Sequence, residues 1–73
     1  MTAKEFKECR DEWGLTPSQM NRFIYLGSVS RVFEFEGGKR KIPPHVEQNI
    51  NLMTELALYA PDKFQEKIEA AKK

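Results

Sequence analysis

The sequence predicts an all-α fold, a single compact bundle of four to five short helices. Apolar residues recur every three or four positions in successive segments, which is the spacing of one helix face. Most of these segments begin at a serine, threonine or proline and stop near a glycine or proline, as helices do. At 73 residues the chain is long enough for one domain only, residues 1–73.

The first helix is expected over residues 4–13. One face carries residues at i, i+3, i+4 and i+7: Phe6, Cys9, Arg10 and Trp13. Thr2 is the expected N-cap, with Glu5 completing a capping box. Gly14 then stands where a left-handed residue ends the helix.

The second helix is expected to open at Thr16, the N-cap. Pro17 suits the first helical position, and Gln19 completes a second capping box. Its apolar face consists of Met20, Phe23 and Ile24. Gly27 is expected to end the helix or its turn.

The third helix is expected over residues 29–36, with Ser28 as its N-cap. Val29, Val32 and Phe35 are spaced three apart and are expected to face the core, and two glycines follow the segment. A strand is the competing interpretation, because the segment is rich in β-branched and aromatic residues. The serine cap and the glycine stop favour the helix.

The rest of the chain contains a basic loop and two more amphipathic segments. Lys39, Arg40 and Lys41 form the loop, and a long helix over residues 44–59 follows. Its apolar residues form two stripes: Val46, Ile50, Met53 and Ala57 in one, and Leu52, Leu56 and Tyr59 in the other. Residues 61–73 form an amphipathic segment that is a candidate dimer contact.

Composition excludes several classes of site. One cysteine, Cys9, forms no internal disulfide, and a single Cys with a single His makes a metal site or a metal cofactor unexpected. No apolar run reaches the length of a membrane span, and no signal peptide is evident, so we expect a cytoplasmic protein. We expect no small-molecule ligand and no enzymatic activity, because no catalytic pair or triad is apparent.

The capped helices, the short Ser28 helix and the basic stretch before Ile42-Pro43 resemble the helix-turn-helix of the Cro/phage-repressor (XRE) class. Within that class the chain is most similar to the N-terminal DNA-binding domain of anti-CRISPR-associated repressors. The similarity runs without gaps over the first two-thirds of the chain. It rests on Met1-Thr2, Lys4-Glu5, Arg10, Ser18, Ile24, Ser28, Glu36, Gly38, Pro43 and Val46-Glu47-Gln48. Tyr25 replaces the glycine that usually follows the second helix.

The resemblance implies that the third helix enters the major groove of double-stranded DNA. Its outer face would then present Ser30, Arg31, Phe33 and Glu34 to the bases. Arg31 suits guanine, Phe33 a thymine methyl group and Glu34 the amino group of cytosine. The alternatives are that Arg31 contacts phosphate alone, that Phe33 belongs to the core, and that Glu34 orients Arg31 or repels other sequences. Residues expected to contact phosphates are Ser18, Gln19, Arg22, Ser28, Lys39, Arg40 and Lys41.

Arg10 and Glu36 are expected to form a structural ion pair. In the resembled class an arginine of the first helix meets a glutamate at the end of the third. Here Arg10 also lies on an apolar face, where a charge needs a partner. The larger C-terminal domain of those regulators does not follow in this sequence. A homodimer is therefore expected to form through Leu52, Leu56 and Tyr59 or the C-terminal segment, and a monomer is the alternative.

These observations predict a sequence-specific DNA-binding regulator. The resemblance implies a repressor that acts as a homodimer on a palindromic operator and controls its own phage or mobile-element operon. The alternative is a small protein-binding module on the same scaffold, such as an antitoxin or an anti-CRISPR-like inhibitor. The net charge of +1 is low for a DNA-binding protein and keeps this alternative open.

Overall fold

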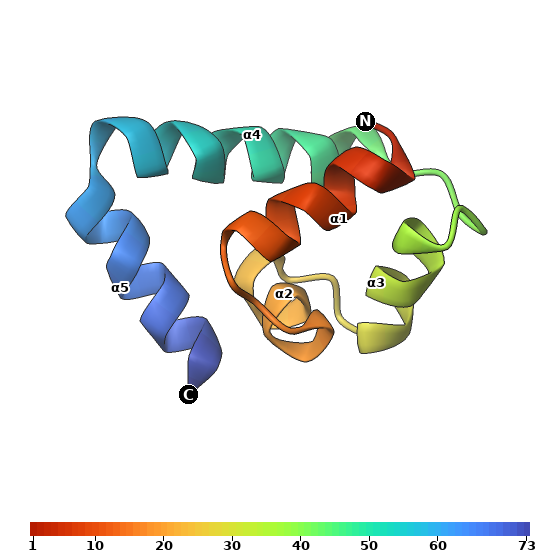
Figure 1. Cartoon of the computed structure of the whole chain (residues 1–73), viewed down its shortest axis with the longest axis horizontal. Coiled ribbons are helices and arrows are strands. Elements are labelled where there is room, and N and C mark those ends of the chain that lie inside the picture. Colours follow the sequence, from red (N-terminus) through yellow and green to blue (C-terminus); the bar gives the residue numbers. More distant parts are fainter.

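The computed structural model describes residues 1–73 and confirms the all-α prediction. Its five helices are α1 (Ala3–Glu12), α2 (Pro17–Ile24), α3 (Val29–Glu36), α4 (Pro44–Tyr59) and α5 (Pro61–Lys72). The strand interpretation of residues 29–36 is wrong, because the segment is helical throughout. The long helix α4 runs along one side of the molecule, and α3 and α5 lie at opposite ends with α2 between them (Figure 1).

Both predicted capping boxes are present at the starts of α1 and α2. The Thr2 hydroxyl accepts a hydrogen bond from the Glu5 amide at 3.1 Å, and the Glu5 carboxylate accepts one from the Thr2 amide at 2.8 Å. Thr16 and Gln19 form the equivalent bonds at 3.2 and 2.9 Å. Each box satisfies two amides that have no partner within the helix, so local sequence sets both starting points.

The core brings together side chains from all five helices. The rings of Phe6 and Phe35 meet edge to face at 5.6 Å and join α1 to α3. Trp13, Phe23 and Phe64 form a second aromatic group, with ring centroids 5.3–5.7 Å apart. This group attaches α5 to α2 and the end of α1. The buried residues are Phe6, Leu15, Met20, Phe23, Ile24, Val32, Phe35, Val46, Ile50, Ile68 and Ala71.

Arg10 and Glu36 are in direct contact and nearly buried, with 13% and 12% of their side chains exposed. The Arg10 Nε donates to one carboxylate oxygen at 2.6 Å, and a terminal nitrogen donates to the other at 2.9 Å. The second terminal nitrogen donates to the Leu15 carbonyl at 2.9 Å. The hydrogen bond to Glu36 raises the pKa of Arg10 above its ordinary value. The arginine therefore links α1, the loop before α2 and the end of α3.

Candidate nucleic-acid interface

The turn between α2 and α3 places the two helices against each other. α2 ends at Ile24 because Tyr25 adopts the left-handed conformation, with φ 57° and ψ 53°. Its amide and that of Leu26 both donate to the Asn21 carbonyl, which satisfies the end of the helix. Gly27, with φ +83°, lies further along the turn. Tyr25 thus ends the helix after Ile24, and Gly27 belongs to the turn alone.

The side chains of α3 divide into a buried face and an exposed face. Val32 and Phe35 are 0% and 1% exposed. Phe33 is 59% exposed, so the interpretation of Phe33 as a core residue is wrong. The expectation that Val29 faces the core is also wrong, since it is 37% exposed. Val29 is the first residue of α3, and the buried side chains come three and six residues later.

Ser30 and Arg31 lie on the exposed part of α3, as a base-contacting role requires. Glu34, by contrast, is only partly exposed. The Ser28 hydroxyl caps the helix by accepting a hydrogen bond from the Ser30 amide at 3.2 Å. A serine hydroxyl can still donate its own hydrogen while it accepts, so the cap leaves Ser28 able to meet a phosphate.

The basic loop over residues 39–41 is folded back onto the end of α3. Gly38 turns the chain with φ +75°. The Glu34 carbonyl then accepts hydrogen bonds from the amides of Lys39 at 3.0 Å and Arg40 at 3.4 Å. Lys39, Arg40 and Lys41 are all exposed. The loop therefore lies beside the outer side of α3.

Glu34 and Arg40, both proposed to contact DNA, contact each other. The Arg40 Nε donates to a Glu34 carboxylate oxygen at 2.6 Å, and the two side chains are 48% and 32% exposed. This hydrogen bond, with the positive charges of Arg40, Arg31 and Lys39, holds the pKa of Glu34 below its ordinary value. The carboxylate of Glu34 is therefore ionised and already engaged near neutral pH.

The start of α2 contributes two of the predicted phosphate contacts. Ser18 is exposed in the first turn, where backbone amides point outward and favour anions. The Gln19 side-chain oxygen is engaged in the capping box with Thr16, which leaves only its amide nitrogen free to donate.

Arg22 does not join the residues around α3. Its terminal nitrogen donates to the Lys73 carbonyl at 2.6 Å, so it lies on the side of α2 that faces α5. α5 and α3 lie at opposite ends of the molecule (Figure 1). Arg22 and the basic loop therefore lie on different parts of the molecule, because α5 packs on this side of α2. The phosphate contact of Arg22 stays a prediction, since its side chain is exposed.

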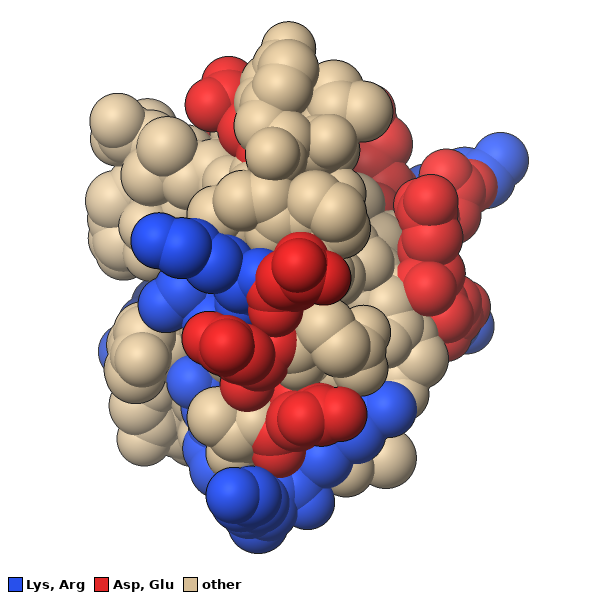
Figure 2. Space-filling view, turned by 90° about the vertical axis from the view of Figure 1, so that its left-hand side faces the viewer, with Lys and Arg blue, Asp and Glu red and all other residues tan.

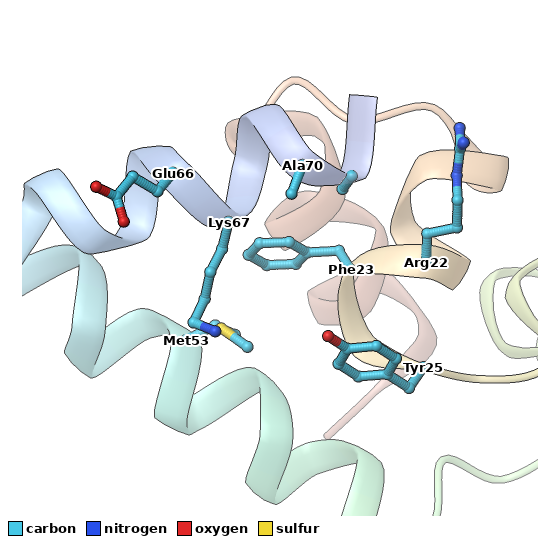
Figure 3. A pocket seen from close by; sticks show the side chains of 8 residues that line it. Arg22, Phe23, Tyr25, Met53, Glu66, Lys67 and Ala70 are labelled. Carbon is cyan, nitrogen blue, oxygen red and sulfur yellow. The ribbon is translucent and has the colours of Figure 1, made fainter. Parts of the chain in front are cut away.

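A pocket of about 340 Å³ lies where α2, α4 and α5 meet (Figure 3). The Phe23 ring, Met53 and the small side chains of α5 form its apolar wall. Lys67 extends across it toward Met53, and the Tyr25 ring stands at its edge (Figure 3). The lining residues are Arg22, Phe23, Tyr25, Met53, Glu66, Lys67, Ala70 and Ala71. Charges of both signs surround it, so it favours no single ligand charge.

The outer side of α4 carries exposed apolar side chains. Leu52 and Tyr59, both predicted dimer contacts, are 54% and 81% exposed, whereas Leu56 is partly buried. Leu58, which the sequence did not single out, is 71% exposed. Leu58 falls outside both apolar stripes of α4, and a leucine outside the stripes is the sequence signal for an exposed apolar side chain. No other part of the chain covers Leu52, Leu58 or Tyr59.

The face at the α5 end carries charges of both signs, and acidic side chains gather along its right edge (Figure 2). Acidic and basic side chains are interspersed over it, and its upper part, toward α4, is largely uncharged (Figure 2). A phosphate backbone favours surfaces with a local excess of positive charge. This face is therefore a poorer match to DNA than the loop at residues 39–41.

The structure contains no group of three or more His, Cys, Asp or Glu side chains that could hold a metal ion. None of its helices is both long and apolar enough to cross a membrane. Burial raises the pKa of the Cys9 thiol, and nearby glutamates act in the same direction. Comparisons with protein-family models, curated proteins and solved structures return no match for this chain.

Proposed function

We propose that this protein is a sequence-specific, double-stranded DNA-binding regulator in which α2 and α3 act as a helix-turn-helix. The observation that carries the proposal is the outer surface of α3. Arg31 is exposed there beside Ser30 and Phe33, and the basic loop is tied to the end of the same helix. A short helix with this surface fits the major groove, where each base pair shows its own pattern of donors and acceptors.

Three exposed side chains of α3, those of Ser30, Arg31 and Phe33, each have a defined partner in this proposal. Arg31 donates two hydrogen bonds to guanine O6 and N7, and Phe33 packs on a thymine methyl group. Ser30 donates to or accepts from a neighbouring base edge. Residues 39–41 and Ser18 contact phosphates and set the position of the helix without reading sequence.

The proposed regulator acts as a homodimer on a palindromic operator. Exposed Leu52 and Tyr59 on α4 supply apolar area for a symmetric contact, with α5 beside it. Two copies would place their α3 helices in major grooves about 34–36 Å apart. A dimer bound to a promoter in this way would block the binding of RNA polymerase. By its resemblance to anti-CRISPR-associated repressors, the protein would act in the cytoplasm on its own phage or mobile-element operon.

Fluorescence anisotropy with labelled duplexes tests the proposal. DNA from upstream of the gene, a scrambled duplex and a salt series are compared. We expect preferential binding of the native duplex and a salt dependence set by few phosphates. Arg31→Ala should cost about 1–3 kcal/mol and relax the preference at one base pair. The matched control is Lys63→Ala, which removes an exposed charge from α5 and should change nothing.

Equal, weak and salt-sensitive binding to both duplexes would overturn sequence-specific recognition. Sedimentation equilibrium tests the dimer separately. Leu52→Glu should yield monomers, and Lys7→Glu, at an exposed position of α1, should leave the assembly unchanged. A monomeric wild-type protein that still prefers its operator would overturn the dimer alone.

A protein-binding module is the second candidate, and one observation favours it. Four large hydrophobic side chains besides Leu52 are more than half exposed, and one of them, Phe33, lies on the presumed DNA face. They are Tyr25, Phe33, Leu58 and Tyr59. Exposed aromatic side chains are common at protein interfaces. An antitoxin or an anti-CRISPR-like inhibitor would bind a stoichiometric protein partner through them and would show no operator preference.

A further inference from the structure

Glu34 is joined to Arg40 in a way that constrains the guanidinium group. The contact uses the Arg40 Nε, which donates to Glu34 Oε2 at 2.6 Å. Backbone hydrogen bonds from Lys39 and Arg40 to the Glu34 carbonyl hold the loop in the same place. The main chain and the side chain of one residue of α3 thus both fix the position of Arg40.

The geometry leaves the outer part of Arg40 free. Its two terminal nitrogens make no hydrogen bond or ion pair within the chain. These nitrogens carry four N–H groups, and the forked pair matches the oxygens of a phosphate. The side chain is 48% exposed. Arg40 is therefore able to bind Glu34 and an anion at the same time.

We propose that Glu34 is a positioning residue for Arg40. Its carboxylate binds the Arg40 Nε, and this contact directs the terminal nitrogens of Arg40 toward one DNA phosphate near the bases that α3 contacts. The inference rests on the proposed function and deepens it. Glu34 then reads no base itself. Because a phosphate contact carries no sequence information, Arg40 held in this way contributes to the binding of any duplex.

Two other roles for Glu34 make different predictions. As a reader of cytosine, Glu34 would change the base preference when replaced. As a purely repulsive charge, its removal would strengthen binding to every duplex, because DNA is an anion. As a positioning residue, its removal weakens binding to every duplex by the same factor. The sign and the sequence dependence of the effect separate the three roles.

The test compares Glu34→Ala, Glu34→Gln, Arg40→Ala and the double variant by anisotropy on operator, point-substituted and scrambled duplexes. Glu34→Ala should weaken binding roughly two- to five-fold on all of them, the range of one partly exposed charged contact. Arg40→Ala should also reduce the slope of log K against log salt by about 1. The double variant should bind no more weakly than Arg40→Ala alone, because Glu34 acts through Arg40. Glu34→Gln retains an acceptor oxygen and should recover part of the loss.

Glu12→Ala is the matched control, since it removes the same charge from an exposed position of α1. Tighter binding by Glu34→Ala, a changed base preference, or additive effects of the two variants would each overturn the proposal. Equal effects of Glu34→Ala and Glu12→Ala would also overturn it, because net charge would then explain both.

A measurement without DNA separates this inference from the proposed function. In the NMR spectrum of the free protein, the Arg40 Nε–H signal should be protected from solvent exchange and should lose that protection in Glu34→Ala. An unprotected signal in the wild type overturns the positioning role even if operator binding is confirmed. A protected signal in a protein with no operator preference overturns the proposed function and, with it, the DNA role of the pair.

Discussion

Arg10 and Glu36 join the middle of the chain to its start, with two hydrogen bonds at 2.6 and 2.9 Å between residues 26 positions apart. The same guanidinium also donates to the Leu15 carbonyl. Three donor groups of one side chain therefore bind α3 and the loop before α2 to α1. The Arg10–Glu36 contact fixes the C-terminal end of α3, which is the end opposite the turn between α2 and α3.

Arg10→Ala should loosen the fold rather than alter specificity. It leaves the Glu36 carboxylate, 12% exposed, without its partner, which costs about 1–3 kcal/mol. For a chain of this size the melting temperature should fall by roughly 4–8 °C for each kcal/mol. Lys7→Ala, on the exposed side of α1, is the control. Equal melting temperatures for Arg10→Ala and the wild type would show that the pair contributes nothing.

Tyr25→Gly should stabilise the turn between α2 and α3. Tyr25 has a φ of 57°, which costs a residue with a Cβ about 1 kcal/mol or more, and its side chain is 85% exposed. Glycine removes the strain but adds freedom to the unfolded chain, so the net gain should be about 0.5 kcal/mol. Thermal unfolding measures it. Gly27→Ala, which adds a Cβ at φ +83°, should act in the opposite direction, and a stabilised Gly27→Ala would contradict this account.

Phe64→Ala should release α5 from the rest of the bundle. The centroid of the Phe64 ring lies 5.7 Å from the ring centroids of Trp13 and Phe23, and Phe64 is only partly buried. Its removal should cost about 2–3 kcal/mol, at or below the lower end for a phenylalanine. Hydrogen exchange should accelerate in α5 more than in α1, α2 and α3. Phe33→Ala, at a position 59% exposed on α3, should leave exchange in α5 unchanged. Uniform acceleration by Phe64→Ala would show that α5 does not open separately.

Acid should weaken the contact between Glu34 and Arg40. The hydrogen bond from Arg40 lowers the pKa of Glu34 from its ordinary value of 4.5, so the ionised form is favoured in the folded chain. Its contribution to stability is present above pH 4.5 and is lost as the pH falls through the lower, folded-state value. The melting temperature of the wild type should therefore fall more between pH ~6 and ~3 than that of Glu34→Gln, which does not titrate at this position. Identical falls for the two proteins would remove the claim.

The sequence by itself determined where the helices begin. Thr2, Thr16 and Ser28 act on amides two or three residues away, and Gly14 and Gly38 supply left-handed backbone just after α1 and α3. These interactions are local, so they are readable without knowledge of the fold. The end of α2 was less readable, because Tyr25 takes a conformation that glycine normally signals.

Only the tertiary structure decided which charged and aromatic side chains remain available for a partner. Arg22 contacts the end of α5, Glu34 contacts Arg40, and Phe33 is left exposed. Spacing in the sequence gives the face of a helix but not what packs against it. The six-residue separation of Glu34 and Arg40 matches no helical repeat. The two side chains meet because the chain reverses at Gly38 between them. Their contact depends on that reversal, and so does the surface that α3 presents.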